Sequence, residues 1–66
     1  MKKMYGTIKW FKNEKGYGYI NGYDKETYFF DITNSINKDN FFENEEVLFI
    51  PMFDSKIPYA KGVEKQ

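Results

Sequence analysis

The sequence predicts an all-β fold of five short antiparallel strands, in a single domain that covers residues 1–66. Runs of β-branched and aromatic residues recur between turns rich in Gly, Asn and Asp, which is the pattern of strands and hairpins. No stretch of useful length has the periodicity of an amphipathic helix. The chain is also near the size at which one hydrophobic core is only just sufficient, so we expect every strand to contribute to that core.

The first half of the chain reads as a three-stranded meander. Residues 7–11 are rich in β-formers, and the polar turn at 13–16 ends in Gly before a second run at 17–20. A second turn signal at 21–24 leads into a third strand over residues 27–32. Because both turns are short, we predict that these strands pair with their neighbours in sequence.

The second half predicts a long loop and two more strands. Residues 33–46 are polar and Asn-rich, which is typical of a crossing loop with one helical turn. The fourth strand runs from Val47 to Ile50 or Phe53, and Pro51 within it has no N–H for the ladder, so it should lie at an edge, a bulge or the strand's end. After a turn, the fifth strand covers 58–63. This order fits a small five-stranded antiparallel barrel of OB type; an SH3-like barrel is the alternative.

The composition argues against catalysis and metal binding. With neither Cys nor His, the chain has no disulfide, no Cys/His zinc site and no histidine general base. The carboxylates at 43–46 lack ligand spacing and indicate a solvated loop. We therefore predict that the protein is not an enzyme and has no cofactor, metal or small-molecule substrate. Since the longest apolar run is interrupted by Pro51, we predict no membrane segment and a cytoplasmic location.

The charge is zero overall but unevenly distributed. Residues 1–25 hold six Lys against two carboxylates, a net +4, and residues 26–66 hold four Lys against eight carboxylates, a net −4. A net charge of zero disfavours a protein that grips duplex backbone by charge alone. These charges are equally compatible with an ordinary solvated surface.

The third strand must expose an aromatic ring. Side chains alternate between the two faces of a strand, so Tyr28 and Phe30 share one face while Phe29 and Asp31 share the other. A carboxylate is rarely buried in a core. We therefore predict that Phe29 points outward with Asp31.

The same reasoning places two tyrosines on the outside of the second strand. Ile20 needs burial, and Gly18 shares its face, so Tyr17 and Tyr19 point outward. If strands two and three pair, these tyrosines lie beside Phe29 and form a contiguous surface of rings. The alternative is that the rings only pack an aromatic-rich core.

An exposed group of rings beside lysines suits single-stranded nucleic acid, because every base has a π-face and its phosphate can reach an ammonium group. We therefore predict a protein that binds single-stranded RNA or DNA. The alternative is a protein-interaction module that receives a peptide on the same aromatic face, as SH3 grooves receive polyproline. We expect a monomer, with a dimer as the alternative.

Four segments resemble the cold-shock domain family. The segment Gly6-Thr7-Ile8-Lys9-Trp10-Phe11 and the following Lys15-Gly16-Tyr17-Gly18-Tyr19-Ile20 are similar to the family's opening strand and first ribonucleoprotein motif. The segment Tyr28-Phe29-Phe30-Asp31-Ile32 falls at the spacing of the second motif, and Lys56-Ile57-Pro58-Tyr59-Ala60-Lys61-Gly62-Val63 is similar to the last strand. The resemblance is specific in residues 6–32 and loose in residues 33–46. It implies an OB-type barrel that acts as an RNA chaperone or cold-shock-type regulator.

The resemblance also implies a binding surface, with one residue that strand alternation does not explain. Its residues are Lys9, Trp10, Phe11, Lys15, Tyr17, Tyr19 and Phe29, flanked by Lys56 and Tyr59, with Asp31 at a site position and Phe42, or else Phe41, from the loop. Strict alternation places Trp10 inward beside Ile8, so only a bulge or strong coiling would expose it.

Three positions depart from the family's pattern. Asp31 replaces a ring-bearing His, Ile32 replaces an aromatic residue, and Lys12 occupies a common Asn position. A carboxylate at position 31 repels phosphate instead of stacking on a base. We therefore expect weaker binding or an altered base preference compared with a typical member.

Overall fold

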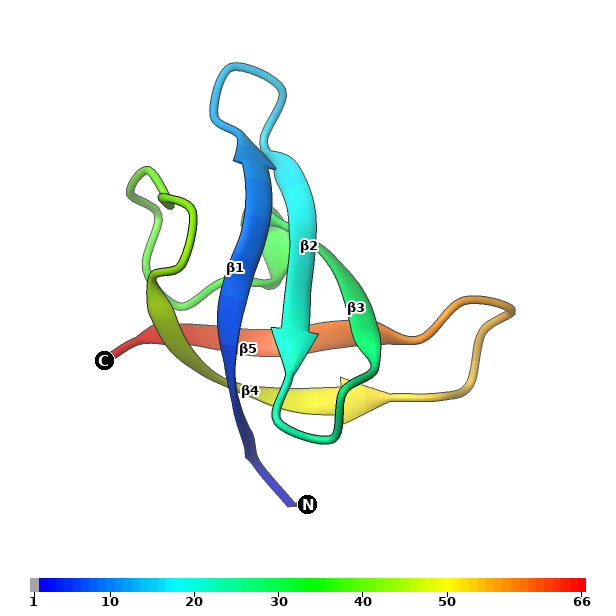
Figure 1. Cartoon of the computed structure of the whole chain (residues 1–66). Helices are drawn as coiled ribbons and strands as arrows, with labels where there is room; N and C mark the ends of the chain where they lie inside the picture. Colours follow the sequence, from blue (N-terminus) through cyan, green and yellow to red (C-terminus); the bar gives the residue numbers. More distant parts are fainter. Residues whose placement is uncertain (1) are drawn as a thin grey trace.

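Five strands and one short 3₁₀ helix make up the described part of the chain, residues 2–66 of a computed structural model (Figure 1). The strands and the helix, η1, are β1 (Met4–Lys12), β2 (Tyr17–Gly22), β3 (Thr27–Asp31), η1 (Ile32–Asn34), β4 (Glu46–Met52) and β5 (Tyr59–Lys65). The predicted strands are all present, and η1 supplies one helical turn, as predicted for the long loop, although it begins at Ile32, which was expected in the third strand. No helix in residues 2–66 is long and apolar enough to cross a membrane.

The strands close into a barrel in the order β1-β2-β3-β5-β4. Four of the five neighbouring pairs are antiparallel, but β3 and β5 run parallel, with Phe29 opposite Tyr59. The prediction of an entirely antiparallel barrel was therefore wrong at this pair. The reason is geometric: an odd number of strands cannot alternate in direction around a closed ring, so one neighbouring pair must be parallel.

The strand ends differ from the predicted ends where pairing extends them. β1 begins at Met4 instead of Thr7, because its first four residues pair with β4. β3 ends at Asp31, which caps η1, so Ile32 belongs to the helix. Pro51 is the last residue but one of β4, as expected of a residue that lacks an N–H for the ladder. β5 continues past Val63 to Lys65 because it pairs with the start of β4.

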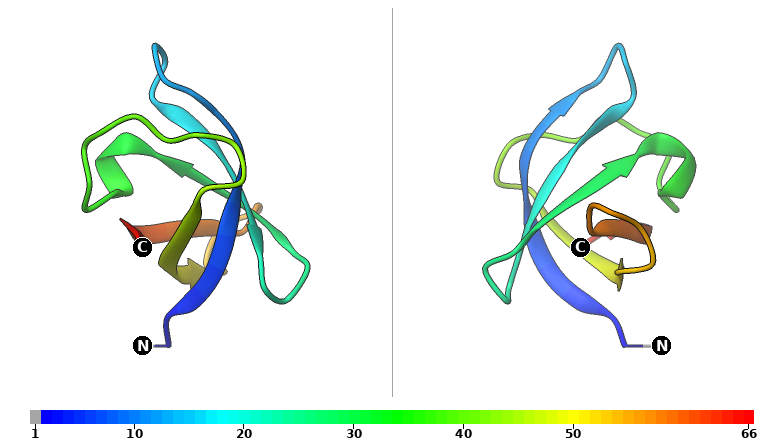
Figure 2. Two further views of the ribbon diagram at one scale, coloured as in Figure 1. Left: turned by 60° about the vertical axis from the view of Figure 1, so that its left-hand side comes forward. Right: turned by 90° about the vertical axis from the view of Figure 1, so that its right-hand side faces the viewer.

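The core consists of inward side chains from all five strands and one loop residue. The fully or almost fully buried members are Ile8, Ile20, Tyr28, Phe30, Phe41, Val47, Phe49, Ala60 and Val63. Phe41 enters from the loop between η1 and β4, where its N–H donates to Asn13 Oδ1 and its carbonyl accepts from Asn13 Nδ2 (3.1 and 3.3 Å). Figure 2 shows this loop arching from η1 back to the side of β1. The barrel interior is therefore filled, and binding must use its outer surface.

Candidate nucleic-acid interface

A bulge in β1 turns Trp10 toward the outside of the barrel. Ile8 lies opposite Ile20 and Trp10 lies opposite Tyr19, so Lys9 is an extra residue between two paired positions. An extra residue resets the alternation of the following side chains. Trp10 consequently shares the outer face with Tyr19; of the two expected ways to expose it, a bulge or strong coiling, the structure shows the bulge.

Glycine at position 18 allows β1 and β2 to come close at this bulge. A Cβ built on Gly18 would overlap the carbonyl oxygen of Trp10 and lie 2.8 Å from the Cα of Phe11. Any larger residue would push the strands apart. The position of Trp10 against β2 therefore depends on this glycine.

Four aromatic side chains from three adjacent strands form a continuous cluster, which we call the aromatic platform: Trp10, Tyr17, Tyr19 and Phe29. Trp10 lies edge-on to Tyr17 and Tyr19, with ring centroids 5.9 and 5.1 Å apart. Phe29 lies edge-on to the same two tyrosines, at 6.1 and 5.6 Å. Each ring thus contacts two others, and none of the four belongs to the buried core. The outward positions predicted for Tyr17, Tyr19 and Phe29 are confirmed.

The platform is part of a row of rings that crosses four strands. Tyr19 is paired with Trp10 on one side and with Phe29 on the other, and Phe29 is paired with Tyr59 of β5. The backbone N–H of Phe29 donates to the carbonyl oxygen of Pro58 (3.1 Å), which holds β5 against β3. The parallel pair therefore brings Tyr59 into line with the platform.

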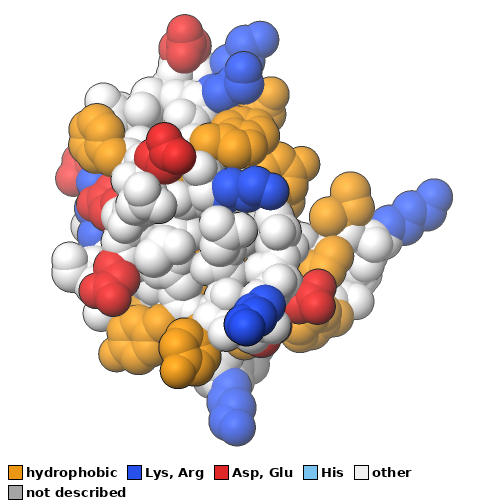
Figure 3. Space-filling view, in the orientation of Figure 1, with side chains coloured by type: hydrophobic (Ala, Val, Ile, Leu, Met, Phe, Trp, Pro, Cys, Tyr) orange, Lys and Arg blue, Asp and Glu red, His pale blue; other side chains and the backbone are white. Residues whose placement is uncertain are grey.

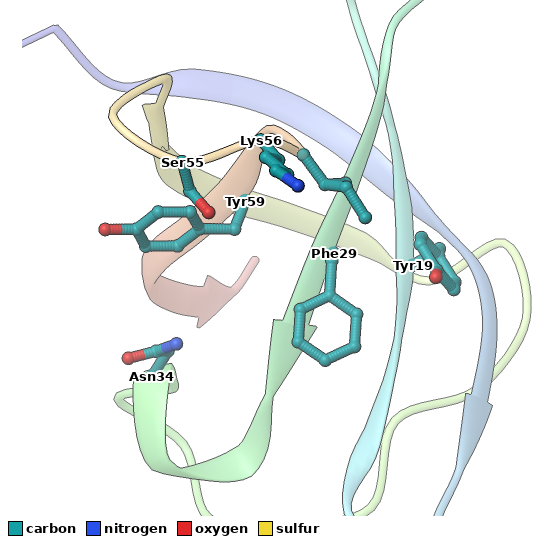
Figure 4. A pocket seen from close by; sticks show the side chains of 7 residues that line it. Tyr19, Phe29, Asn34, Ser55, Lys56 and Tyr59 are labelled. Carbon is teal, nitrogen blue, oxygen red and sulfur yellow. The ribbon is translucent and has the colours of Figure 1, made fainter.

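A groove of about 440 Å³ lies between Phe29 and Tyr59. Figure 4 shows Phe29 standing between Tyr19 and Tyr59, with Asn34 at one end of the groove and Ser55 and Lys56 at the other. Its lining residues are Tyr19, Phe29, Asn34, Ser55, Lys56, Ile57 and Tyr59. The pKa of Tyr59 is raised mainly by the interaction of its hydroxyl with the carboxylate of Asp54, and less strongly by burial. The groove thus combines stacking rings with an amide, a hydroxyl and an ammonium group.

Lysines surround the platform. Lys9, Lys12, Lys15 and Lys56 are exposed, and the Nζ of Lys12 lies 5.9 Å from the ring centroid of Trp10. Figure 3 shows lysine side chains above and below a group of hydrophobic side chains at the upper end of β1 and β2. Ammonium groups at these positions can reach the phosphates of a strand whose bases lie on the rings.

Two phenylalanines of the expected surface lie elsewhere. Phe11 follows Trp10 and therefore faces inward, where its ring stacks on Phe30 and lies edge-on to Phe41, with centroids 5.2 and 5.3 Å apart. Of the two loop rings, Phe41 is in the core and Phe42 is exposed, with the Nζ of Lys65 5.8 Å from its centroid. No ring pair within residues 2–66 joins Phe42 to the platform.

Asp31 has a structural role at the edge of the platform. It is paired with Tyr17 in the sheet, and its Oδ1 accepts hydrogen bonds from the backbone N–H (3.0 Å) and the hydroxyl of Thr33. These bonds cap η1. The carboxylate is therefore turned toward the helix while its negative charge remains beside the rings.

Comparison with known proteins agrees with this geometry. Residues 4–66 match the family model described as the "'Cold-shock' DNA-binding domain". The chain belongs to the cold-shock domain family. This cold-shock domain is also 36% identical over 64 residues to the cold shock-like protein CspB of Escherichia coli (strain K12), a match that covers 92% of this chain and 90% of that protein. Members of the family are nucleic-acid-binding proteins without catalytic activity, so the predictions of nucleic-acid binding and of a non-enzyme are confirmed.

Three residues that line the groove of this cold-shock domain were not predicted from the sequence. Asn34, Ser55 and Ile57 belong to η1 and to the turn before β5, which are far apart along the chain. They meet only because β3 and β5 pair. No local pattern in the sequence carries that information.

Proposed function

We propose that this cold-shock domain acts as a single unit that binds single-stranded RNA or DNA by stacking unpaired bases on the aromatic platform. The observation that supports this most directly is the contact of four outward rings from three adjacent strands. Paired bases in a duplex keep their faces covered by their neighbours, whereas unpaired bases can lie flat on such rings.

Base stacking can supply the binding free energy of a protein with no net charge. Each base stacked on an aromatic side chain contributes about 1–3 kcal/mol, so a few such contacts give useful affinity without a strongly basic surface. The exposed lysines around the platform, Lys9, Lys12, Lys15 and Lys56, can add phosphate contacts. We therefore expect binding that weakens moderately with salt.

The cellular role that follows is an RNA chaperone or transcript-level regulator in the cytoplasm. A protein that occupies the faces of unpaired bases disfavours their return to a duplex, and this requires no bond to be broken. We propose that it acts as a monomer, because the platform is complete within one chain.

Titration of Trp10 fluorescence with short oligo-dT and oligo-U at two salt concentrations tests this proposal. We expect saturable quenching that weakens as salt rises and is largely lost in Phe29→Ala. Ile36→Ala is the matched control, because it truncates an exposed hydrophobic side chain (60% exposed) outside the platform and the groove.

Two outcomes would contradict base stacking on the platform. If the folded protein shows no quenching at micromolar concentration, the platform is not a base-stacking surface. Salt-independent binding of a polyproline peptide that is lost in Phe29→Ala would instead assign the rings to a peptide.

A further inference from the structure

Two exposed tyrosines outside the platform lie at the end of the barrel opposite the turn between β1 and β2. Tyr5 is 57% exposed and Tyr23 is 86% exposed. The backbone N–H of Tyr23 donates to the carbonyl oxygen of Tyr5 (2.9 Å), which fixes the two residues side by side. Tyr23 lies in the turn between β2 and β3, which projects from the end of the barrel opposite to the turn between β1 and β2 (Figure 1).

Two hollows lie between these tyrosines. Their volumes are about 500 and 350 Å³, and Tyr5, Tyr23 and Glu46 line both. We call this region the tyrosine site. Lys3 lines the larger hollow, and Asn21 and Lys25 line the smaller one. Hydrophobic side chains form a second group at the lower edge of the face in Figure 3, separate from the upper group.

The tyrosine site is continuous with the aromatic platform. Thr7 and Asn21 lie opposite each other between the two regions, and both line the smaller hollow. The exposed Lys9 is two residues further along β1, next to Trp10. Tyr19 and Tyr23 are four residues apart, which is at most about 13 Å at a strand's rise of about 3.3 Å per residue, because Tyr23 follows the end of β2. About four stacked nucleotides, at about 3.4 Å each, cover that distance.

The polar groups of the site favour a base over an apolar ligand. Carboxylates accept hydrogen bonds from the exocyclic amino group of cytosine, and Asn pairs with adenine, whereas thymine and uracil have no such amino group. Glu46 forms no ion pair with any other residue of the described chain, so its carboxylate is free to accept. Asp24, by contrast, is already bonded to the Tyr28 hydroxyl and to the backbone N–H of Glu26.

We infer that the tyrosine site binds an amino-bearing base, which is cytosine, adenine or guanine, of the same single strand whose other bases lie on the platform. Tyr5 and Tyr23 supply the stacking faces, Glu46 and Asn21 accept or pair with the base edge, and Lys3 and Lys25 contact phosphates. The inference rests on the proposed function of the platform and extends it with a position that selects bases. A protein partner fits less well, because the strip that links both regions, residues 6–9 of β1 and 20–22 of β2, carries the exposed Lys9 and no carboxylate.

Oligonucleotides of mixed sequence test the inference. The probes are a six-nucleotide oligo-dT, the same oligonucleotide with four cytidines added at its 5′ or at its 3′ end, and a ten-nucleotide oligo-dT, each titrated against Trp10 fluorescence. We expect one of the two cytidine-extended strands to bind about tenfold more tightly than the ten-nucleotide oligo-dT, because its cytosine can donate a hydrogen bond from an amino group that thymine lacks.

Three variants test whether the tyrosine site causes the preference for cytidine. Tyr5→Ala combined with Tyr23→Ala should remove the cytidine advantage and leave the affinity for the six-nucleotide oligo-dT unchanged. Tyr5→Phe combined with Tyr23→Phe keeps both rings and should retain most of the advantage. Glu46→Ala should reduce the preference for cytidine over thymidine while stacking persists.

Failure of the inference and failure of the proposed function are distinguishable. Suppose that the six-nucleotide oligo-dT binds but that neither cytidine-extended strand binds more tightly than the ten-nucleotide oligo-dT. The tyrosine site then does not select a base, and the proposed function of the platform still holds. If no oligonucleotide binds, the proposed function itself fails. If the double Ala variant changes only the sedimentation coefficient of the free protein, the exposed tyrosines form an interface between copies of this chain and the inference is overturned.

Discussion

Trp10 lies directly opposite Tyr19, with ring centroids 5.1 Å apart, although it is only two residues from the buried Ile8. The extra residue Lys9 makes this arrangement compatible with a β-strand, because it shifts Trp10 to the outer face. The same row continues through Phe29 to Tyr59. The bulge in β1 and the parallel pairing of β5 with β3 thus bring four aromatic residues into one line.

Tyr59 should extend the stacking surface. We expect Tyr59→Ala to weaken binding of a ten-nucleotide oligo-dT by about 1–3 kcal/mol, because one stacked base is lost. Tyr59→Phe is the control: it keeps the ring and removes only the hydroxyl that interacts with Asp54. Isothermal titration calorimetry measures both. A loss of affinity in Tyr59→Phe as large as in Tyr59→Ala would show that the hydroxyl, and not the ring, makes the contact.

Phe11 should matter for stability more than for binding. Its ring packs on Phe30 and Phe41 inside the barrel, so Phe11→Ala should lower the free energy of unfolding by about 2–4 kcal/mol, somewhat less than for a fully buried ring. Urea denaturation followed by circular dichroism measures this. Phe11→Leu preserves most of the volume and should stay folded. If Phe11→Leu has normal stability but no longer binds oligo-dT, Phe11 belongs to the binding surface.

Asp31 should oppose binding through its charge and support the fold through its cap. Asp31→Asn keeps an oxygen that can accept from the Thr33 N–H and removes the negative charge beside Tyr17, so oligonucleotide affinity should rise several-fold at low salt. Asp31→His should raise it as well, by adding a ring. Asp31→Ala should cost about 1 kcal/mol of stability through loss of the cap. Unchanged affinity in both Asp31→Asn and Asp31→His would show that the carboxylate is neutral toward the ligand.

Tyr28 should make the fold sensitive to high pH. Its pKa is raised from 10.0 to about 12. Burial is the largest cause, and the hydrogen bond to Asp24 Oδ2 (2.6 Å) and the negative charges of Asp24 and Glu26 contribute less. The folded protein therefore holds this proton more tightly than the unfolded chain does. The associated stability is fully present below pH 10 and is lost as the pH rises from about 10 to 12, by on the order of 2 kcal/mol.

Thermal unfolding between pH 8 and pH 12 measures this loss. Tyr28→Phe removes the titrating hydroxyl, so its melting temperature should fall less steeply above pH 10 than that of the unaltered protein. Identical slopes for the two proteins would attribute the loss to other groups.

Local sequence determined the strands and most of the platform. The two-residue alternation in β2 and β3, combined with the cost of burying Asp31 and the need to bury Ile20, is enough to place Tyr17, Tyr19 and Phe29 outside. The short turns then fix the pairing of β2 with β3 and bring these rings together. All of this follows from steric alternation and hydrophobicity over about fifteen residues of chain.

Only the tertiary structure decided the rest. The bulge at Lys9, the inward position of Phe11 and the burial of Phe41 instead of Phe42 depend on how strands pack across the closed barrel. The groove beside Tyr59 depends on the parallel pairing of β3 with β5: a closed ring with an odd number of strands requires a parallel pair, and the strand order places it there. Barrel closure brings together residues that are distant in the sequence. The contacts that it creates therefore depend on the whole chain and cannot be predicted from any one segment.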